Sequence, residues 1–183
     1  MSSHFKHTVS GFTLVELLAT IAIIAILFGI GVPSFRTVTT SSRVSSEING
    51  LLVDLQFARS EALKEGQPVT MCVSTDGASC TGGTDWKAGW IAFSDPNADA
   101  NVDVSETLLK IQKPFTGTDS LTEANSLSSL TFNREGFALN LASGAFLTLH
   151  DSSSNKRFTR CLAVTLTGSM ETLTHTSSPT KCT

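Results

Sequence analysis

The sequence predicts an α+β protein in which one long N-terminal helix, first membrane-spanning and then amphipathic, packs on a C-terminal antiparallel β domain. Three observations predict this fold. An apolar run fills residues 12–32, apolar side chains then recur at helical spacing as far as residue 63, and beyond Pro68 short strand-like segments alternate with turn-rich stretches. At 183 residues the chain is long enough for one domain with a sizeable core and one extra segment.

The pattern divides the chain into four consecutive segments. A short polar segment, residues 1–11, precedes an apolar helix at 12–33, an amphipathic helix follows at 34–66, and a β-rich domain fills 67–183. Lys6 is the one full positive charge before the apolar run. This end is therefore expected to stay in the cytoplasm, with the β domain on the exported side of the membrane.

The apolar run, FTLVELLATIAIIAILFGIGV, is long enough to cross a membrane. At a helical rise of about 1.5 Å per residue it spans roughly 31 Å, the thickness of the hydrocarbon core of a bilayer. A cleaved secretory signal is one alternative, but residues 29–33 make a poor cleavage site. A plain membrane anchor is another, and it leaves Glu16 unexplained, because an ionised carboxylate near the bilayer centre costs about 2.5 kcal/mol or more. Glu16 therefore needs a positive group close by.

The helix is expected to run from about residue 12 to 65. Pro33 lacks an amide donor and is expected either to kink the helix or to open it locally. Gly66 followed by Pro68 ends the helix. The apolar stripe that packs on a sheet consists of Val44, Ile48, Leu51, Leu52, Leu55, Ala58, Ala62 and Leu63.

Short segments beyond Pro68 are expected to form the strands of an antiparallel domain, because turn-rich stretches separate them at regular intervals. The expected strands are 69–74, 89–94, 107–112, 130–132, 136–141, 145–150, 158–166 and, last, 169–173.

The four cysteines, Cys72, Cys80, Cys161 and Cys182, lack the close spacing of a zinc or redox site. An even count in an exported chain suggests disulfides, and four cysteines allow three connectivities. We favour the two sequence-local pairs, Cys72–Cys80 and Cys161–Cys182. The second would hold a C-terminal tail that would otherwise fray, and four reduced thiols are the alternative.

Composition and motifs argue against two function classes. The formal charge is −3, and without Lys6 the chain keeps 12 basic against 16 acidic side chains, or −4, which gives no general attraction to nucleic acid. No Gly-x-Ser-x-Gly elbow, His-Glu-x-x-His motif or phosphate-binding loop is present. We therefore expect no enzyme, no cofactor and no nucleic-acid partner.

An acidic stretch at residues 95–106 has the spacing of a calcium-binding EF-hand loop. Ala100, however, occupies the position where that loop needs a glycine, and strands rather than helices are expected on both sides. An acidic hairpin loop is the simpler interpretation, and no metal site is predicted. The candidate ligands are Asp95, Asn97, Asp99, Asn101, Asp103 and Glu106.

Residues 11–17, GFTLVEL, resemble the signature of type IV prepilins. The resemblance implies that prepilin peptidase cuts between Gly11 and Phe12 and that the new amino group of Phe12 is N-methylated. It also implies that Glu16 neutralises the amine of a neighbouring subunit inside a filament, for which residues 12–33 supply the core helix. A buried pair of this kind sets register more than stability.

Three further segments are similar to the GspH/FimT group of minor pilins and pseudopilins: residues 86–95 (WKAGWIAFSD), 106–109 (ETLL) and 130–136 (LTFNREG). The resemblance implies a helix packed on two small β-sheets and a low-copy structural subunit. Its partners would be other major and minor pilins and prepilin peptidase. It would sit in the bacterial inner membrane with its β domain in the periplasm before joining a filament.

The preferred interpretation is a minor type IV pilin that helps to initiate pilus assembly. A minor pseudopilin of type II secretion is one alternative, and a DNA-uptake pilin is another. DNA-binding members of the group resemble one another in a Gly-Arg-x-Arg segment, where this chain has GSME at 168–171. Beyond this segment only Lys181 is basic, and four basic side chains before it are interpreted as solvated strand and turn residues that could form a small basic patch. They are Arg134, Lys156, Arg157 and Arg160.

Overall fold

The computed structural model describes residues 11–123, 125–180 and 182. Residues 1–10 of the expected leader, which was predicted at 1–11, lie outside this part. The chain forms two compact units, Met1–Thr39 and Thr40–Thr183.

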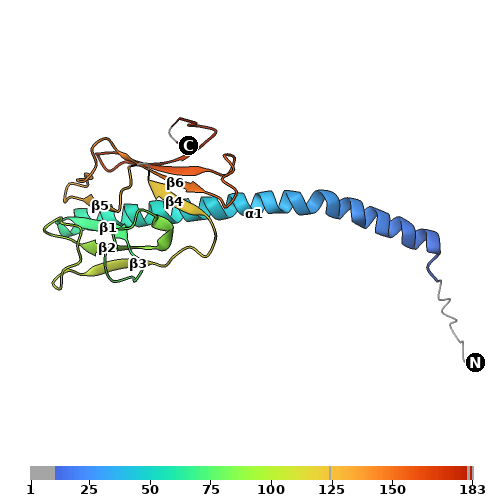
Figure 1. Cartoon of the computed structure of the whole chain (residues 1–183), viewed down its shortest axis with the longest axis horizontal. Coiled ribbons are helices and arrows are strands. Elements are labelled where there is room, and N and C mark those ends of the chain that lie inside the picture. Colours follow the sequence, from blue (N-terminus) through green and yellow to red (C-terminus); the bar gives the residue numbers. More distant parts are fainter. Residues whose placement is uncertain (1–10, 124, 181, 183) are drawn as a thin grey trace, which may run out of the picture. The chain divides into compact units, whose positions relative to one another are not determined.

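One helix, α1 (Leu14–Glu65), contributes to both units (Figure 1). It continues through Pro33 without interruption, so the expected local opening is not seen in the isolated chain. It ends where the sequence predicted, because Gly66 adopts a left-handed φ of +70° and donates its amide to Ala62 O at 3.0 Å.

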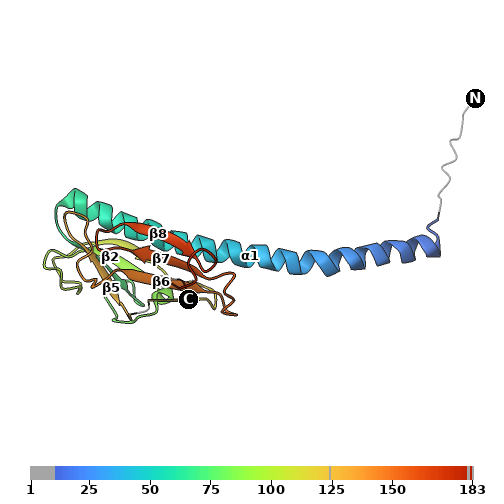
Figure 2. The same cartoon turned by 90° about the horizontal axis from the view of Figure 1, so that it is seen from above.

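The second unit combines residues 40–65 of α1 with two four-stranded antiparallel sheets (Figures 1 and 2). The first sheet has the order β3-β2-β1-β5 and the second the order β4-β6-β7-β8. A short 3₁₀ helix, Trp86–Ala88, precedes β2. The strands are β1 Val69–Val73, β2 Trp90–Ser94, β3 Leu108–Gln112, β4 Ser120–Glu123, β5 Ser129–Phe132, β6 Ala145–His150, β7 Arg160–Val164 and β8 Met170–Thr174.

Two of the strand predictions need correction. The expected strand at 136–141 is reduced to a single bridge between Phe132 and Ala138, because the side chain of Asn140 takes the place of a backbone partner. Its Oδ1 accepts from Thr131 N at 3.1 Å and its Nδ2 donates to Ser129 O at 2.7 Å. Strand β4 was not predicted, because its sequence SLTE is short and three of its four residues are polar.

The main core lies between α1 and the near faces of both sheets. The helix contributes most of the predicted stripe, of which Val44, Leu51 and Leu55 are fully buried. Leu63 is the exception, because the last turn of the helix leaves its side chain 50% exposed. Both tryptophans pack in this core, and each indole N–H has an acceptor. Trp86 donates to Leu127 O and Trp90 to Asp54 Oδ2, both at 2.9 Å.

A smaller cluster covers the far face of the first sheet. Cys72, Ile91 and Phe93 are buried there, with Cys80 and Val102 packed against them. The structure contains the disulfides Cys72–Cys80 and Cys161–Cys182, the two pairs that the sequence analysis favoured. The first closes the loop over this cluster, and the second ties the C-terminal tail to β7.

Candidate functional site

The most unusual surface of the chain is the exposed apolar start of α1. Glu16 is the only charged residue between Phe12 and Phe35. An 18-residue apolar window of this helix is long enough to cross a membrane, and none of it is buried inside the structure. A surface of this size has to be covered by lipid or by apolar helices of other chains.

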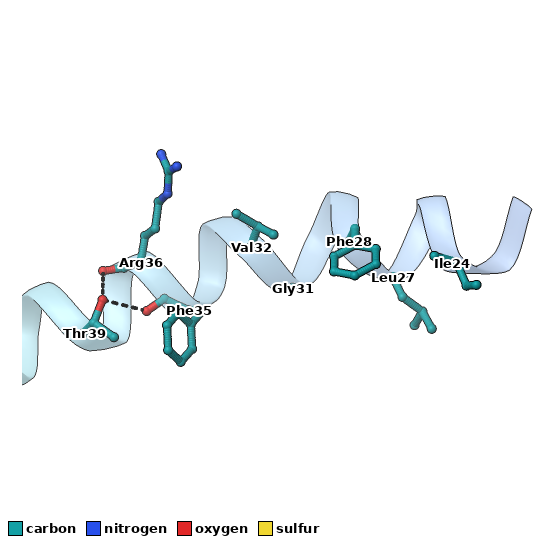
Figure 3. A pocket seen from close by; sticks show the side chains of 8 residues that line it. All are labelled: Ile24, Leu27, Phe28, Gly31, Val32, Phe35, Arg36 and Thr39. Carbon is teal, nitrogen blue, oxygen red and sulfur yellow. Dashed lines mark hydrogen bonds between the residues drawn. The ribbon is translucent and has the colours of Figure 1, made fainter. Parts of the chain in front are cut away.

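Large side chains on one face of this helix border a shallow apolar groove within the first unit (Figure 3). Leu27, Phe28, Val32 and Phe35 supply most of its lining, and Gly31 leaves its floor open. Such ridges and grooves let one helix pack closely against another.

The helix begins with an N-cap at Thr13 that sequence analysis did not identify. Thr13 Oγ1 accepts from Glu16 N at 3.3 Å, and Leu17 N donates to Thr13 O at 3.1 Å. The signal was present in the sequence as Thr-x-x-Glu before an apolar run. Among the residues that the structure describes, no side chain donates to the Glu16 carboxylate. Phe12, expected to become the N-terminus, is 73% exposed.

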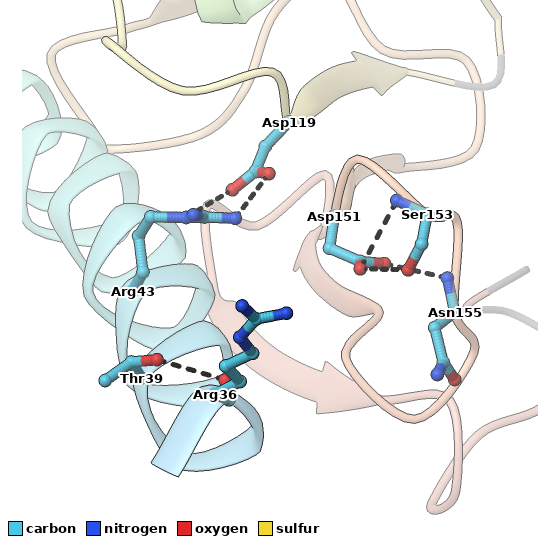
Figure 4. A network of polar contacts seen from close by, with 7 residues as sticks. All are labelled: Arg36, Thr39, Arg43, Asp119, Asp151, Ser153 and Asn155. Carbon is cyan, nitrogen blue, oxygen red and sulfur yellow. Dashed lines mark hydrogen bonds and ion pairs between the residues drawn. The ribbon is translucent and has the colours of Figure 1, made fainter. Parts of the chain in front are cut away.

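A second polar cluster lies in the domain unit, where α1 meets the loop before β4 (Figure 4). Arg43 forms a bidentate ion pair with the buried Asp119, with Nε to Oδ2 at 2.9 Å and Nη2 to Oδ1 at 2.7 Å. Glu47 lies one helical turn further on, and its Oε2 is buried without a hydrogen-bond partner among the described residues. Burial, and then the charge of Asp119, raise the pKa of Glu47 to about 7, although Arg43 opposes the rise.

Glu47 should make folding stability depend on pH near neutrality. Because its pKa is higher in the folded chain than its ordinary value of 4.5, the folded state holds more protons between pH 4.5 and 7. Its contribution therefore falls as the pH rises through this window and stays low above it. We expect Glu47→Gln to flatten the profile and to gain about 1 kcal/mol at pH 8, allowing for partial solvent screening.

Chemical unfolding of the full chain in detergent micelles at several pH values between 5 and 8 tests this. Glu171→Gln, which neutralises an exposed carboxylate on β8, is the charge-matched control. A Glu47→Gln profile parallel to that of the wild type across the whole range would contradict the assignment.

Two carboxylates of the acidic loop at 95–106 accept hydrogen bonds from the loop itself and from the neighbouring strand β1. Asp95 is fully buried and accepts from Thr70 Oγ1 at 2.6 Å, Asp99 N at 3.2 Å and Ala100 N at 3.1 Å. Glu106 accepts from Asp103 N at 2.9 Å, while burial raises its pKa. Ala98 and Ala100 have left-handed φ of 55° and 60°. Within residues 11–123, 125–180 and 182, no three His, Cys, Asp or Glu side chains gather as a metal site.

The residues considered for DNA binding are engaged in different ways. Arg134 pairs with its neighbour Glu135 at 2.8 Å, whereas Arg160 donates to Ser41 Oγ at 3.4 Å. Gly168 packs against Arg59, and Glu171 is exposed on β8. An acidic side chain thus occupies the strand where the DNA-binding resemblance would require an arginine.

Comparison with known proteins decides the family. A family model described as "Type II transport protein GspH" matches residues 47–168, two thirds of the chain. A second model, the prokaryotic N-terminal methylation motif, matches residues 6–32. The chain belongs to the GspH family of minor pilins and pseudopilins. Proteins of this family are structural pilins that anchor in a membrane and associate with other pilins in a pilus or pseudopilus.

Two crystal structures of a minor pilin share the fold of this chain. The type IV minor pilin FimU of Pseudomonas aeruginosa, in crystals of space group P21, is 19% identical and has a TM-score of 0.61. That match covers 78% of this GspH-family chain and 96% of FimU. A second crystal form of FimU gives 18% identity and a TM-score of 0.56 over 78% and 99% of the chains. The minor pseudopilin EpsH of Vibrio cholerae is 10% identical, with a TM-score of 0.49 over 72% and 96%.

Proposed function

We propose that this GspH-family chain is a minor type IV pilin that takes part in initiating pilus assembly. The observation that carries the proposal is the exposed apolar helix at the methylation motif, with Glu16 as its one charge and a FimU-like β domain after it. Before assembly the helix spans the inner membrane with the β domain in the periplasm, as Lys6 at the opposite end favours.

Processing by prepilin peptidase between Gly11 and Phe12 creates the positive group that Glu16 needs. The amide of Glu16 is already held by Thr13, which leaves its carboxylate for a second chain. In a filament the N-methylated amine of Phe12 on a neighbouring subunit pairs with that carboxylate, so that neither charge is left alone among apolar helices.

N-terminal sequencing and intact mass of the protein from cells with and without prepilin peptidase test this proposal. We expect a chain that begins at methylated Phe12 only when the peptidase is present. Gly11→Val should abolish the cut, and Glu16→Ala should leave the cut in place while filament incorporation falls at least tenfold, equivalent to about 1.4 kcal/mol. Gly50→Ala, on an open face of α1, is the control. An uncut chain in peptidase-positive cells would contradict the proposal.

A minor pseudopilin of type II secretion is the second candidate, favoured by the description of the matching family as a type II transport protein. The two differ in what fails when the subunit is removed. Loss of surface pili with normal export of secreted enzymes identifies the pilus subunit, and the reverse identifies the pseudopilin.

A further inference from the structure

Three cations, the exposed Lys156 and Arg157 and the half-buried Arg160, lie on or next to the turn that contacts the start of the domain unit. The guanidinium of Arg160 donates from Nη2 to Ser41 Oγ at 3.4 Å and from Nη1 to Arg157 O at 3.1 Å. Ser41 is the second residue of this unit. Lys156 and Arg157 are exposed beside this contact, and no carboxylate pairs with either one in the described part of the chain.

The turn that carries these cations is well ordered by hydrogen bonds. Asp151 is buried and accepts from Asn155 N at 2.7 Å and from the amide and hydroxyl of Ser153 (Figure 4). Phe158 N donates to Asn155 O at 2.8 Å. Lys156 and Arg157 are thus presented by a fixed turn rather than by a loose loop.

The acidic groups nearest in the fold are already engaged. Asp151 is occupied by its own turn, and Asp119 is paired with Arg43. Glu47, the remaining carboxyl of this part of the helix, has a raised pKa and carries only part of a charge at neutral pH. A chain that is acidic as a whole therefore presents a locally positive surface here.

Covalent continuity limits how far this surface can lie from a membrane. Val32 ends the apolar run and Thr40 opens the domain unit eight residues later. Eight residues span about 12 Å as helix and at most about 28 Å when extended. Whatever the angle between the two units, Ser41 stays within a short reach of the surface of the bilayer that holds the helix.

We propose that Lys156, Arg157 and Arg160 form a site for anionic phospholipid headgroups, which holds the domain on the membrane surface before assembly. Guanidinium and ammonium groups donate to phosphate oxygens, and each cation near an anionic bilayer contributes about fivefold to binding. The inference rests on the membrane anchoring of the proposed function but not on which machine the subunit joins.

Amide hydrogen exchange of the full chain, one copy per lipid nanodisc, tests the site. Discs of phosphatidylcholine alone are compared with discs that also contain phosphatidylglycerol. We expect amides at residues 152–158 to exchange at least about fivefold more slowly in the anionic discs, and high salt to remove the difference.

The Lys156→Ala/Arg157→Ala double variant should lose this protection while its strand amides stay protected, which shows that it remains folded. Lys113→Ala/Arg134→Ala removes two exposed cations elsewhere and should keep it. Equal exchange in the two kinds of disc, or full protection in the Lys156/Arg157 variant, would overturn the site. Protection that needs two copies per disc would instead assign the surface to a neighbouring subunit. N-terminal sequencing of the same samples separates either failure from a failure of the pilin assignment.

Discussion

Replacing Gly168 with alanine is expected to destabilise the domain by about 3 kcal/mol or more. Gly168 has a left-handed φ of +72°, and an added Cβ would lie 2.1 Å from Gly136 O and 2.8 Å from Arg59 Nε. Arg59 cannot simply move away, because its guanidinium joins two turns to α1. It donates to Gly136 O at 2.9 Å and to Thr167 O at 3.4 Å.

The destabilisation has two causes, the left-handed φ and the clash of the added Cβ with Gly136 and Arg59. A second glycine separates them. Gly66 has a similar φ of +70° but nothing within 4 Å of an added Cβ. Gly66→Ala should therefore lose only about 1 kcal/mol, the cost of the backbone conformation. Chemical unfolding in detergent micelles, followed by the fluorescence of Trp86 and Trp90, measures both variants. If both variants lose the same free energy of unfolding, the clash with Gly136 and Arg59 does not contribute to the effect.

Asp54→Ala should cost about 3 kcal/mol, because two partners lose their acceptor. Asp54 is only 5% exposed on α1 and accepts from Trp90 Nε1 at 2.9 Å. Its other oxygen pairs with Lys110 Nζ of β3 at 2.5 Å. The lysine can turn toward water, since 37% of its side chain is exposed, but the indole N–H of the buried Trp90 cannot.

Asp54→Asn distinguishes the hydrogen bond from the charge. An amide oxygen can still accept from Trp90, so the asparagine variant should lose about 1 kcal/mol, clearly less than the alanine variant. Glu61→Ala, which removes the surface pair with Lys64, is the control and should change the unfolding midpoint little. If the alanine and asparagine variants have the same unfolding midpoint, the ion pair with Lys110 rather than the hydrogen bond to the Trp90 indole stabilises the contact between helix and sheet.

Local pattern accounts for much of what the sequence predicted. The apolar run, the single Glu16 within it and the end of the helix at Gly66 are properties of neighbouring residues, as are most strand positions. A turn depends on the φ preferences of a few neighbouring residues, and an apolar helix stripe depends on side chains three or four positions apart. Both patterns can be recognised in the sequence alone. The GspH membership follows from the same local segments.

By itself, then, the sequence determined that this chain has a membrane-length helix ending at Gly66 and a β domain after it. Only the tertiary structure decided which polar groups form hydrogen bonds with each other. The pairs are Asp54 with Trp90, Arg59 with Gly136, and Arg160 with Ser41. These partners lie 36, 77 and 119 residues apart. The physical reason is that such contacts form only when the sheets and the helix pack, and the same packing gives β4 and Asn140 roles that their own short sequences do not specify.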